Sequence, residues 1–484
     1  MGVSGLLDIA KSALFTQRMA LDVTGENIAN VNTPGYSRQT ALLQTRTPIL
    51  SSGFPMGNGV EVGSVRRVYD DFLQRQIRLE NGRYGEASTS HSSMKRVEQL
   101  FSEFGTDGLG TSLSDFFNAW QDLSLNPGGE AERQTLLVRS EALVDRFHQT
   151  ATYLDQVRLE ADRSLQGVTA EVNQLTDGIA TLNQQINELE AMGGEANEQR
   201  DSRDSLVRDL ASKVGITYLE QADGTVTVSL AAGPNLVNGS RAATLSLQPN
   251  VADPQMHDVL YTPSGSASST TDITSILASS GGELAGTIST RDTLVPKVMA
   301  GLDEMAYTLA TQVNTIHSSG YGLNGSTGLP FFTPPTAPVP PATFTAGYSG
   351  IGGISVAIAT TADIAAAQSD PTAAGGGKGD NRNALALGDL RNTQFAMAGG
   401  VSTIEGYYAL LANDVGMTVQ GLNQAQTQSQ TLGNQLEALR QAGSGVSLDE
   451  EFANLLKYQK AFEGAAKLIN ASTEMLDTVL NMVR

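Results

Sequence analysis

The sequence predicts a multidomain α+β protein. Long, coiled-coil-like helices formed by the N- and C-terminal parts of the chain would flank an inserted, mainly β domain. Three observations support this fold class. Both ends of the chain repeat apolar residues every seven positions, which is the pattern of a coiled-coil helix. A track of apolar residues with three- and four-residue spacing runs from 137 to 189. Between about 216 and 383 these repeats give way to alternating and loop-rich segments.

The composition excludes several classes of protein. The 484 residues carry a net charge of -20, so neither nucleic acid nor an anionic membrane surface is an expected partner. There is no cysteine, hence no disulfide framework and no thiol chemistry. No apolar run approaches the length of a membrane span. Asp8 and Lys11 interrupt the apolar run at the N-terminus, and we expect no cleaved signal peptide there.

The first helix should run to about Asn30, where asparagine can take a left-handed C-terminal position. Its weaker apolar column contains Val3, Ala10, Gln17, Thr24 and Val31. Its stronger column contains Leu7, Leu14, Leu21 and Ile28. An amphipathic helix cannot bury its own stripe, so these columns predict a partner helix.

The partner is predicted at the other end of the chain, where Ser447 and Glu450 form a capping box. The helix that follows has a second column of Phe452, Gln459, Ala466, Thr473 and Leu480. Its first column is Leu448, Leu455, Phe462, Ile469, Leu476 and Val483. We predict that the two ends pair and present an assembly seam. The alternative is two unrelated surface helices that pack on a core.

A turn follows the first helix, at Asn32-Thr33-Pro34-Gly35-Tyr36. Proline and then glycine suit the central pair of a type II turn. The run from Asn27 to Gln39, which holds Asn30 and this turn, resembles the N-terminal signature of bacterial flagellar rod, hook and hook-associated proteins. Its Tyr-Ser-Arg-Gln ending is similar to the subgroup of hook-associated protein 1.

Further along, residues 59–65 alternate and predict a strand. Helices are expected at 69–104 and 114–125, and the apolar track predicts a helix of about 55 residues, roughly 80 Å long. Only Ser140 and Arg158 interrupt that track. The charged run 200–204, in a helix expected at 197–214, is interpreted as a solvated face with local ion pairs rather than a metal or acid-base site.

In the insert, residues 216–230 predict a hairpin about Asp223-Gly224. Residues 284–316 read as helical despite Pro296, and 351–358 as a strand. Loops are expected at 264–272, 330–342 and 371–383, which are low in complexity or rich in proline or glycine.

The helical pattern returns at 384. One column holds Tyr408, Val415, Leu422, Ser429 and Leu436. The other holds Ile404, Leu411, Thr418, Ala425, Leu432 and Leu439. We predict that this helix packs antiparallel on the one that ends near Leu189. A hinge is expected at 443–445.

These elements predict three domains. Residues 1–45 and 444–484 would form paired terminal helices, the polymerisation core. Residues 46–215 and 384–443 would form a long-helix rod with a small β segment. Residues 216–383 would be an inserted, mainly β outer domain with a helical excursion.

Further motifs carry the family resemblance: residues 69–76, 320–325, 383–387 and 445–459 are similar to hook-associated protein 1. The resemblance implies a structural subunit that polymerises at the distal end of the hook and joins hook to filament. It also implies uncleaved export, unfolded, through the flagellar type III apparatus to an extracellular site at the hook-filament junction. Implied partners are further copies in a helical or ring assembly, the hook protein, the next hook-associated protein, and a cytoplasmic export chaperone at the C-terminal region.

No enzyme is expected. The four histidines are dispersed and none belongs to an H-E-x-x-H helix, and the glycines at 375–377 lack the spacing of a phosphate-binding loop. We therefore predict no catalytic residue, no cofactor and no metal site. Two alternatives stay open: a distal rod or hook structural protein, and a surface adhesin with the insert as its binding module.

Overall fold

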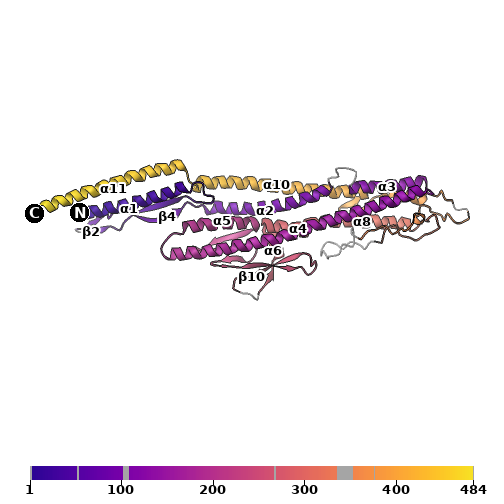
Figure 1. Ribbon diagram of the computed structural model, residues 1–484, viewed down its shortest axis with the longest axis horizontal. Helices are drawn as coiled ribbons and strands as arrows, with labels where there is room; N and C mark the ends of the chain where they lie inside the picture. The colour runs from indigo at the N-terminus through magenta and orange to yellow at the C-terminus, as the bar shows by residue number, and fades with distance from the viewer. Residues whose placement is uncertain are drawn as a thin grey trace.

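The chain forms an elongated rod with both termini at one end (Figure 1). This computed structural model describes residues 3–51, 54–101, 108–265, 269–334, 353–374 and 377–482. The mixture of long helices and small antiparallel sheets confirms the predicted α+β class.

Long helices dominate the structure. The longest, α4, has 62 residues, and the predicted helix of the apolar track is its central part. The helices are α1 (Val3–Ala29), α2 (Asp71–Phe101), α3 (Leu109–Leu125), α4 (Glu130–Ala191), α5 (Asn197–Lys213), α6 (Thr274–Ser280), α7 (Gly282–Ser289), α8 (Val295–His317), α9 (Arg382–Asp389), α10 (Ile404–Ser444) and α11 (Leu448–Met482). A π-helical turn, η1 (Thr290–Leu294), joins α7 to α8, and η2 (Thr361–Asp363) and η3 (Leu390–Asn392) are 3₁₀ turns.

The strands are short and all paired antiparallel. They are β1 (Gln39–Thr45), β2 (Ile49–Ser51), β3 (Phe54–Met56), β4 (Val60–Arg67), β5 (Ile216–Glu220), β6 (Val226–Leu230), β7 (Asn235–Asn238), β8 (Arg241–Ala242), β9 (Thr244–Pro249), β10 (His257–Thr262), β11 (Thr271–Asp272), β12 (Phe395–Met397) and β13 (Gly400–Ser402).

The end of the molecule that holds both termini is formed by α1, α11 and the strands β1–β4, here called the terminal unit. Helices α1 and α11 lie antiparallel along each other (Figure 1). Strands β1 and β4 pair and pack against α1. No residue of the terminal unit belongs to either of the two large apolar cores described below.

The remainder of the long helices form the rod. Helix α10 packs along α2, and α4 packs against α3 and α5 (Figure 1). The predicted antiparallel pairing of α10 with α4 is therefore wrong. Both α2 and α4 offer apolar faces of sufficient length, and a heptad column does not specify which of two such faces it meets.

Two apolar cores stabilise the rod. The core at the far end from the termini is built on α3, the first half of α4, α8 and the first half of α10. It contains Trp120, Phe331 and Phe332, which are fully buried. The second core lies in the middle of the molecule, where the second half of α4 and α5 pack against the β sheets. Burial of large aromatic and aliphatic side chains is the main term that holds such helices together.

The strands of the inserted region lie between 216 and 272, in one sheet of order β5-β6-β7-β8 and another of order β11-β10-β9. The predicted hairpin about Asp223-Gly224 is confirmed by the register of β5 and β6. Helix α7 packs against α2 and α4, and α8 packs against α10 and α4. The strand predicted at 351–358 is wrong for its described part, where Val356 makes only an isolated bridge to Phe332.

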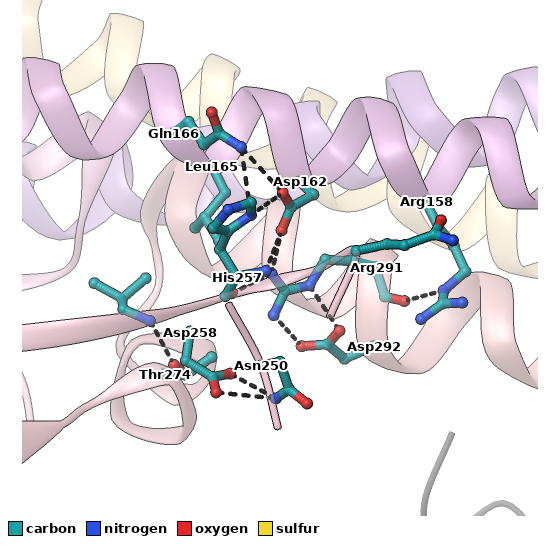
Figure 2. Close-up of polar contacts among 12 residues, drawn as sticks. Arg158, Asp162, Leu165, Gln166, Asn250, His257, Asp258, Thr274, Arg291 and Asp292 are labelled. Atoms are coloured by element: carbon teal, nitrogen blue, oxygen red, sulfur yellow. Dashed lines mark hydrogen bonds and ion pairs between the residues drawn. The ribbon is translucent and has the colours of Figure 1, made fainter. Parts of the chain in front are cut away.

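A buried polar cluster fixes the β region to α4 (Figure 2). Asp162 of α4 accepts hydrogen bonds from the backbone N–H of His257 on β10 (2.8 Å) and from Nη1 of Arg291 in η1 (2.8 Å). Its other carboxylate oxygen lies 2.7 Å from Nδ1 of His257. Burial alone would raise the pKa of Asp162, but these contacts outweigh it and the pKa is lowered.

Arg158 lies one turn before Asp162, and it is one of the two residues that interrupt the apolar track. Its side chain is buried and donates to the carbonyl oxygen of Arg291 (3.2 Å) and to the carboxylate of Asp253 (3.2 Å). The interruption therefore marks a long-range polar contact between α4 and the neighbouring β region.

Candidate assembly interface at the chain termini

The predicted seam residues form two groups in the structure. Eight of them are half-buried where α1 meets α11: Leu7, Leu14, Leu21, Ile28, Leu455, Phe462, Ile469 and Leu476. Their partial exposure fits two helices that pack only on each other and on one small sheet.

The other described seam residues face outward. Leu448 is 42%, Phe452 52% and Leu480 63% exposed. Val483 lies outside the described residues. On α11 the residues buried against α1 are instead Glu451, Ala465 and Ser472. The packed face of α11 thus lies one position before the predicted second column, whose Phe452 and Leu480 are exposed. Four other large apolar side chains of α11 are exposed as well: Leu456, Leu468, Met475 and Val479.

The family turn follows α1 directly. Tyr36 N–H donates to the carbonyl oxygen of Thr33 (3.3 Å), and Gly35 has φ of 83°, as a type II turn requires. Thr33 also donates from its hydroxyl to the side-chain oxygen of Asn30 (3.1 Å). Asn32 and Pro34 are exposed. The turn reverses the chain so that β1 can return along α1.

Asn27 is the polar centre of the terminal unit, and it is 1% exposed. Its side-chain oxygen accepts from the Tyr36 hydroxyl and from the backbone N–H of Gln39, each at 2.9 Å. Its amide nitrogen donates to the carbonyl oxygen of Gln39 (2.9 Å) and to the Glu451 carboxylate (3.3 Å). One buried side chain therefore links α1, the turn, β1 and α11.

Arg38 connects the two ends of the chain a second time. Its Nε donates to Glu451 (2.7 Å) and its Nη1 to Glu450 (2.6 Å). Its backbone N–H donates to the carbonyl oxygen of Ser444, the last residue of α10 (2.9 Å). Arginine bonds to two carboxylates are directional as well as strong, so this contact fixes where α11 begins relative to β1.

Helix α5 attaches the terminal unit to the rod. Arg67, at the end of β4, donates to Asp201 (2.6 Å) and Asp204 (2.9 Å). Asp201 also accepts from the backbone N–H of Ser37 (2.9 Å). The Asn197 side chain donates to the carbonyl oxygen of Val65 (2.7 Å).

The prediction that residues 200–204 form a solvated face with local ion pairs is therefore wrong. Asp201, Arg203 and Asp204 are buried. The partner of the two carboxylates, Arg67, lies more than a hundred residues earlier in the chain. Helical spacing alone cannot reveal an ion pair of that range.

The electrostatics of this joint are set by burial among carboxylates. Burial lowers the pKa of the Arg67 guanidinium, but Asp204 and Asp201 more than compensate, and the net pKa is raised. Burial also raises the pKa of Tyr36, with Glu26 and Asp201 adding to it, and it raises the pKa of Tyr69 to about 12. Both phenols stay protonated at neutral pH, and that of Tyr36 donates its hydrogen bond to Asn27.

Sequence patterns predicted the apolar residues where α1 meets α11, but they gave no sign of the polar contacts of Asn27, Arg38, Glu451 and Asp201. Three of the four stand inside or beside the resembling motifs at the two ends of the chain.

Within the described residues no group of three or more His, Asp or Glu side chains could hold a metal ion. No helix in the same residues is apolar enough over its length to cross a membrane.

Three family models match the chain. The model described as "Flagellar hook-associated protein FlgK helical domain" matches residues 94–332. The model for the C-terminal part of the flagellar basal body rod FlgEFG proteins matches 440–482, and the model for flagella basal body rod proteins matches 7–36. The two shorter matches cover the interlocked parts of α1, the turn and α11.

Whole-length relatives agree with these matches. Flagellar hook-associated protein 1 of Salmonella typhimurium is 29% identical over an alignment 559 positions long, which covers 99% of this chain and 100% of the relative. The same protein of Bacillus subtilis is 29% identical, with 98% and 97% covered. The solved structure of the flagellar hook junction protein FlgK from Burkholderia pseudomallei aligns with a TM-score of 0.67 and 17% identity, over 76% of this chain and 100% of that one. At that identity it supports the fold alone.

Proposed function

The chain belongs to the family of flagellar hook-associated protein 1, and on that premise we propose that it polymerises at the distal end of the hook and joins hook to filament. The family is one of structural flagellar proteins and not of enzymes. The proposed site of action is the hook-filament junction, outside the cell. The hook protein and the next hook-associated protein would be its neighbours there.

The observation that carries this proposal is the outward face of the terminal unit. Phe452, Leu456 and Leu480 are each more than half exposed on a helix whose other face is already packed. Phe452 and Leu456 lie one turn apart near the start of α11 and Leu480 lies near its end, and large exposed apolar residues on an otherwise packed helix mark a protein interaction site. Further copies of the chain, arranged in a ring or helix, would cover it.

The hydrogen bonds around Asn27 and Arg38 explain why both ends of the chain are needed for such an interface. Without α1 and the turn, Glu451 would lose Asn27 and Arg38, the partners that fix the start of α11 relative to the rest of the unit. The outward column of α11 is therefore held in place by residues at the opposite end of the chain.

Unfolded export through the flagellar type III apparatus, with a cytoplasmic chaperone at the C-terminal region, is part of the same proposal. The separation of the terminal unit from the two apolar cores supports it. A segment that buries little apolar area gains little on folding alone. Such a segment can stay unfolded during export.

We also propose a domain division that follows the packing. The polymerisation core would be the terminal unit, and the outer β unit would be confined to the strands between 216 and 272. Helices α7 and α8 would belong to the rod, since their apolar residues lie in the rod cores.

Localisation tests the proposed function. Gold-labelled antibody against the β unit should mark a single band between hook and filament on isolated flagella. Label along the hook would instead favour a hook or rod structural protein. Label spread over the cell surface would favour an adhesin, and either pattern would overturn the proposal.

A further inference from the structure

One long segment of α10 carries no charge. Residues 415–436 contain no Asp, Glu, Lys or Arg. At the chain's average of 17% charged residues, about four would be expected there. Glutamine, asparagine and threonine form half of the segment, 11 of its 22 residues.

The uncharged segment is largely exposed. Helix α10 turns one face toward α2, on which Val415, Ser429 and Leu436 are buried. The opposite side is bare and is here called the amide face. Its exposed residues are Gln420, Asn423, Gln424, Thr427, Gln428, Thr431 and Gln435. Surface helices of an acidic protein normally carry charges on such a face, since water solvates charged groups best.

A heptad column emerges beside the amide face. It begins buried at Ile404 in the far core. Farther along α10 it becomes exposed at Ala425, Leu432 and Leu439, the last two to 38% and 60%. A heptad column is the mark of a helix that packs on another element, yet among the described residues nothing covers the second half of this one.

Gly421 is exposed on the same side of α10. A Cβ added there would have no neighbouring atom within 4 Å. Glycine inside a helix is unfavourable relative to alanine. Gly433 is equally open, and a helix without side chains at these positions allows another surface to approach its backbone closely.

We propose that the amide face and the adjoining Ala425, Leu432 and Leu439 are a contact surface for a second copy of this chain. The inference rests on the proposed function and adds a contact in the rod to the one at the termini. Copies with a net charge of -20 repel each other when they stand side by side, so an uncharged surface is where they can touch at the lowest electrostatic cost.

The chemistry and position of the face both fit this occupant. Side-chain amides donate and accept hydrogen bonds, so one composition serves either side of a contact between identical chains. Helix α10 ends where α11 begins, separated only by residues 445–447. Subunits joined through α11 therefore bring their α10 helices close together.

Cross-linking tests the occupant directly. Since the chain has no cysteine, Gln428→Cys supplies a single thiol for a benzophenone maleimide. Gln185→Cys, at an exposed position of α4, is the matched control. Photolysis of isolated hook-filament complexes should give a covalent dimer of this chain from position 428 and none from 185. A cross-link from 428 to a different protein, or no cross-link, would overturn the proposal.

Charge insertion tests the energetics. Gln428→Lys and Gln428→Glu should each lower incorporation at the junction at least about tenfold, because either charge loses its water in a contact. The melting temperature of the monomer should not change, and the same changes at Gln185 should leave incorporation as in wild type. Wild-type chain missing from the junction would overturn the proposed function itself. Wild-type chain present, with Gln428→Lys equally present, would overturn only the amide-face contact.

Discussion

The rod and the terminal unit are both built from long paired helices, but they are stabilised in different ways. In the rod, large side chains such as Trp120, Phe331 and Leu154 are completely buried in two continuous cores. In the terminal unit, the paired apolar residues are only half-buried, and the fully buried groups include the polar Asn27 and Glu451. The rod therefore has apolar cores of its own, whereas the terminal unit has none and leaves much of its apolar surface for partners.

This difference separates stability from assembly. Core packing sets the free energy of unfolding of the rod. Hydrogen bonds set the geometry of the terminal unit, and their net contribution is small unless one partner is removed. Substitutions in the two regions should therefore have opposite signatures, one in folding and the other in polymerisation.

The largest effect is expected from Phe331→Ala in the far core. The Phe331 ring lies 5.0 to 5.3 Å from those of Phe332, Trp120 and His317, and the cavity left behind should cost about 3–5 kcal/mol. Urea unfolding followed by circular dichroism measures it. Phe15→Ala on α1, where the ring is 67% exposed, is the control. An equal loss in both variants would contradict the comparison.

A pH effect of similar size is expected from His317. Burial lowers the pKa of this imidazole to about 4, from an ordinary 6.5. The folded state therefore holds the neutral ring while the unfolded chain takes up a proton. Stability is complete above pH 6.5 and falls as the pH drops toward 4, by up to about 3 kcal/mol.

The variant His317→Gln checks this assignment, since glutamine does not titrate. It should be less stable than wild type at pH 7, because its side chain replaces a ring that lies between Leu329 and Ala365. Its stability should change less between pH 6.5 and 4 than that of wild type. Parallel pH curves for the two proteins would show that His317 is not the group responsible.

The same contrast explains what the sequence could predict. Local sequence patterns predict the apolar columns of the two terminal helices, the hairpin at Asp223-Gly224 and the turn at Gly35, because each of these features depends on residues a few positions apart. Partner choice is not local. The burial of Asp201 depends on Arg67, and the pairing of α10 with α2 depends on the whole rod.

The shift of the α11 face has the same cause. Hydrophobic periodicity favoured Phe452 for burial, but the chain buries Glu451 instead because Arg38 and Asn27 neutralise and bind its carboxylate. A charged residue with distant partners outranks an apolar neighbour, and no helical pattern shows those partners. Asn27 was likewise visible only as part of a resembling motif.

A smaller effect is expected from Glu451→Gln. The side chain of Glu451 is 2% exposed and holds Arg38, so loss of its charge should weaken local closure of the terminal unit by about 1–3 kcal/mol. Hydrogen exchange in the first turns of α11 should accelerate while the rod stays protected. Glu450→Gln, at a side chain that is 62% exposed, is the matched control and should change exchange little. Equal acceleration in both variants would show that Glu451 contributes no more than Glu450 to closure of the terminal unit.

The smallest effect on folding, and the most informative one for assembly, is expected from Phe452→Ser. The side chain is 52% exposed, so its loss should change the monomer's free energy of unfolding by no more than about 0.5 kcal/mol. The same ring would be buried in an assembly, where losing an aromatic anchor costs about 2 kcal/mol or more per contact. The variant should therefore melt like wild type and fail to accumulate at the hook end.

Leu219→Ser on β5, 67% exposed and far from the termini, should melt like wild type and assemble normally. If Phe452→Ser assembles as well as Leu219→Ser, the exposed column of α11 is not the polymerisation surface, and the contrast between the two regions fails at its main point.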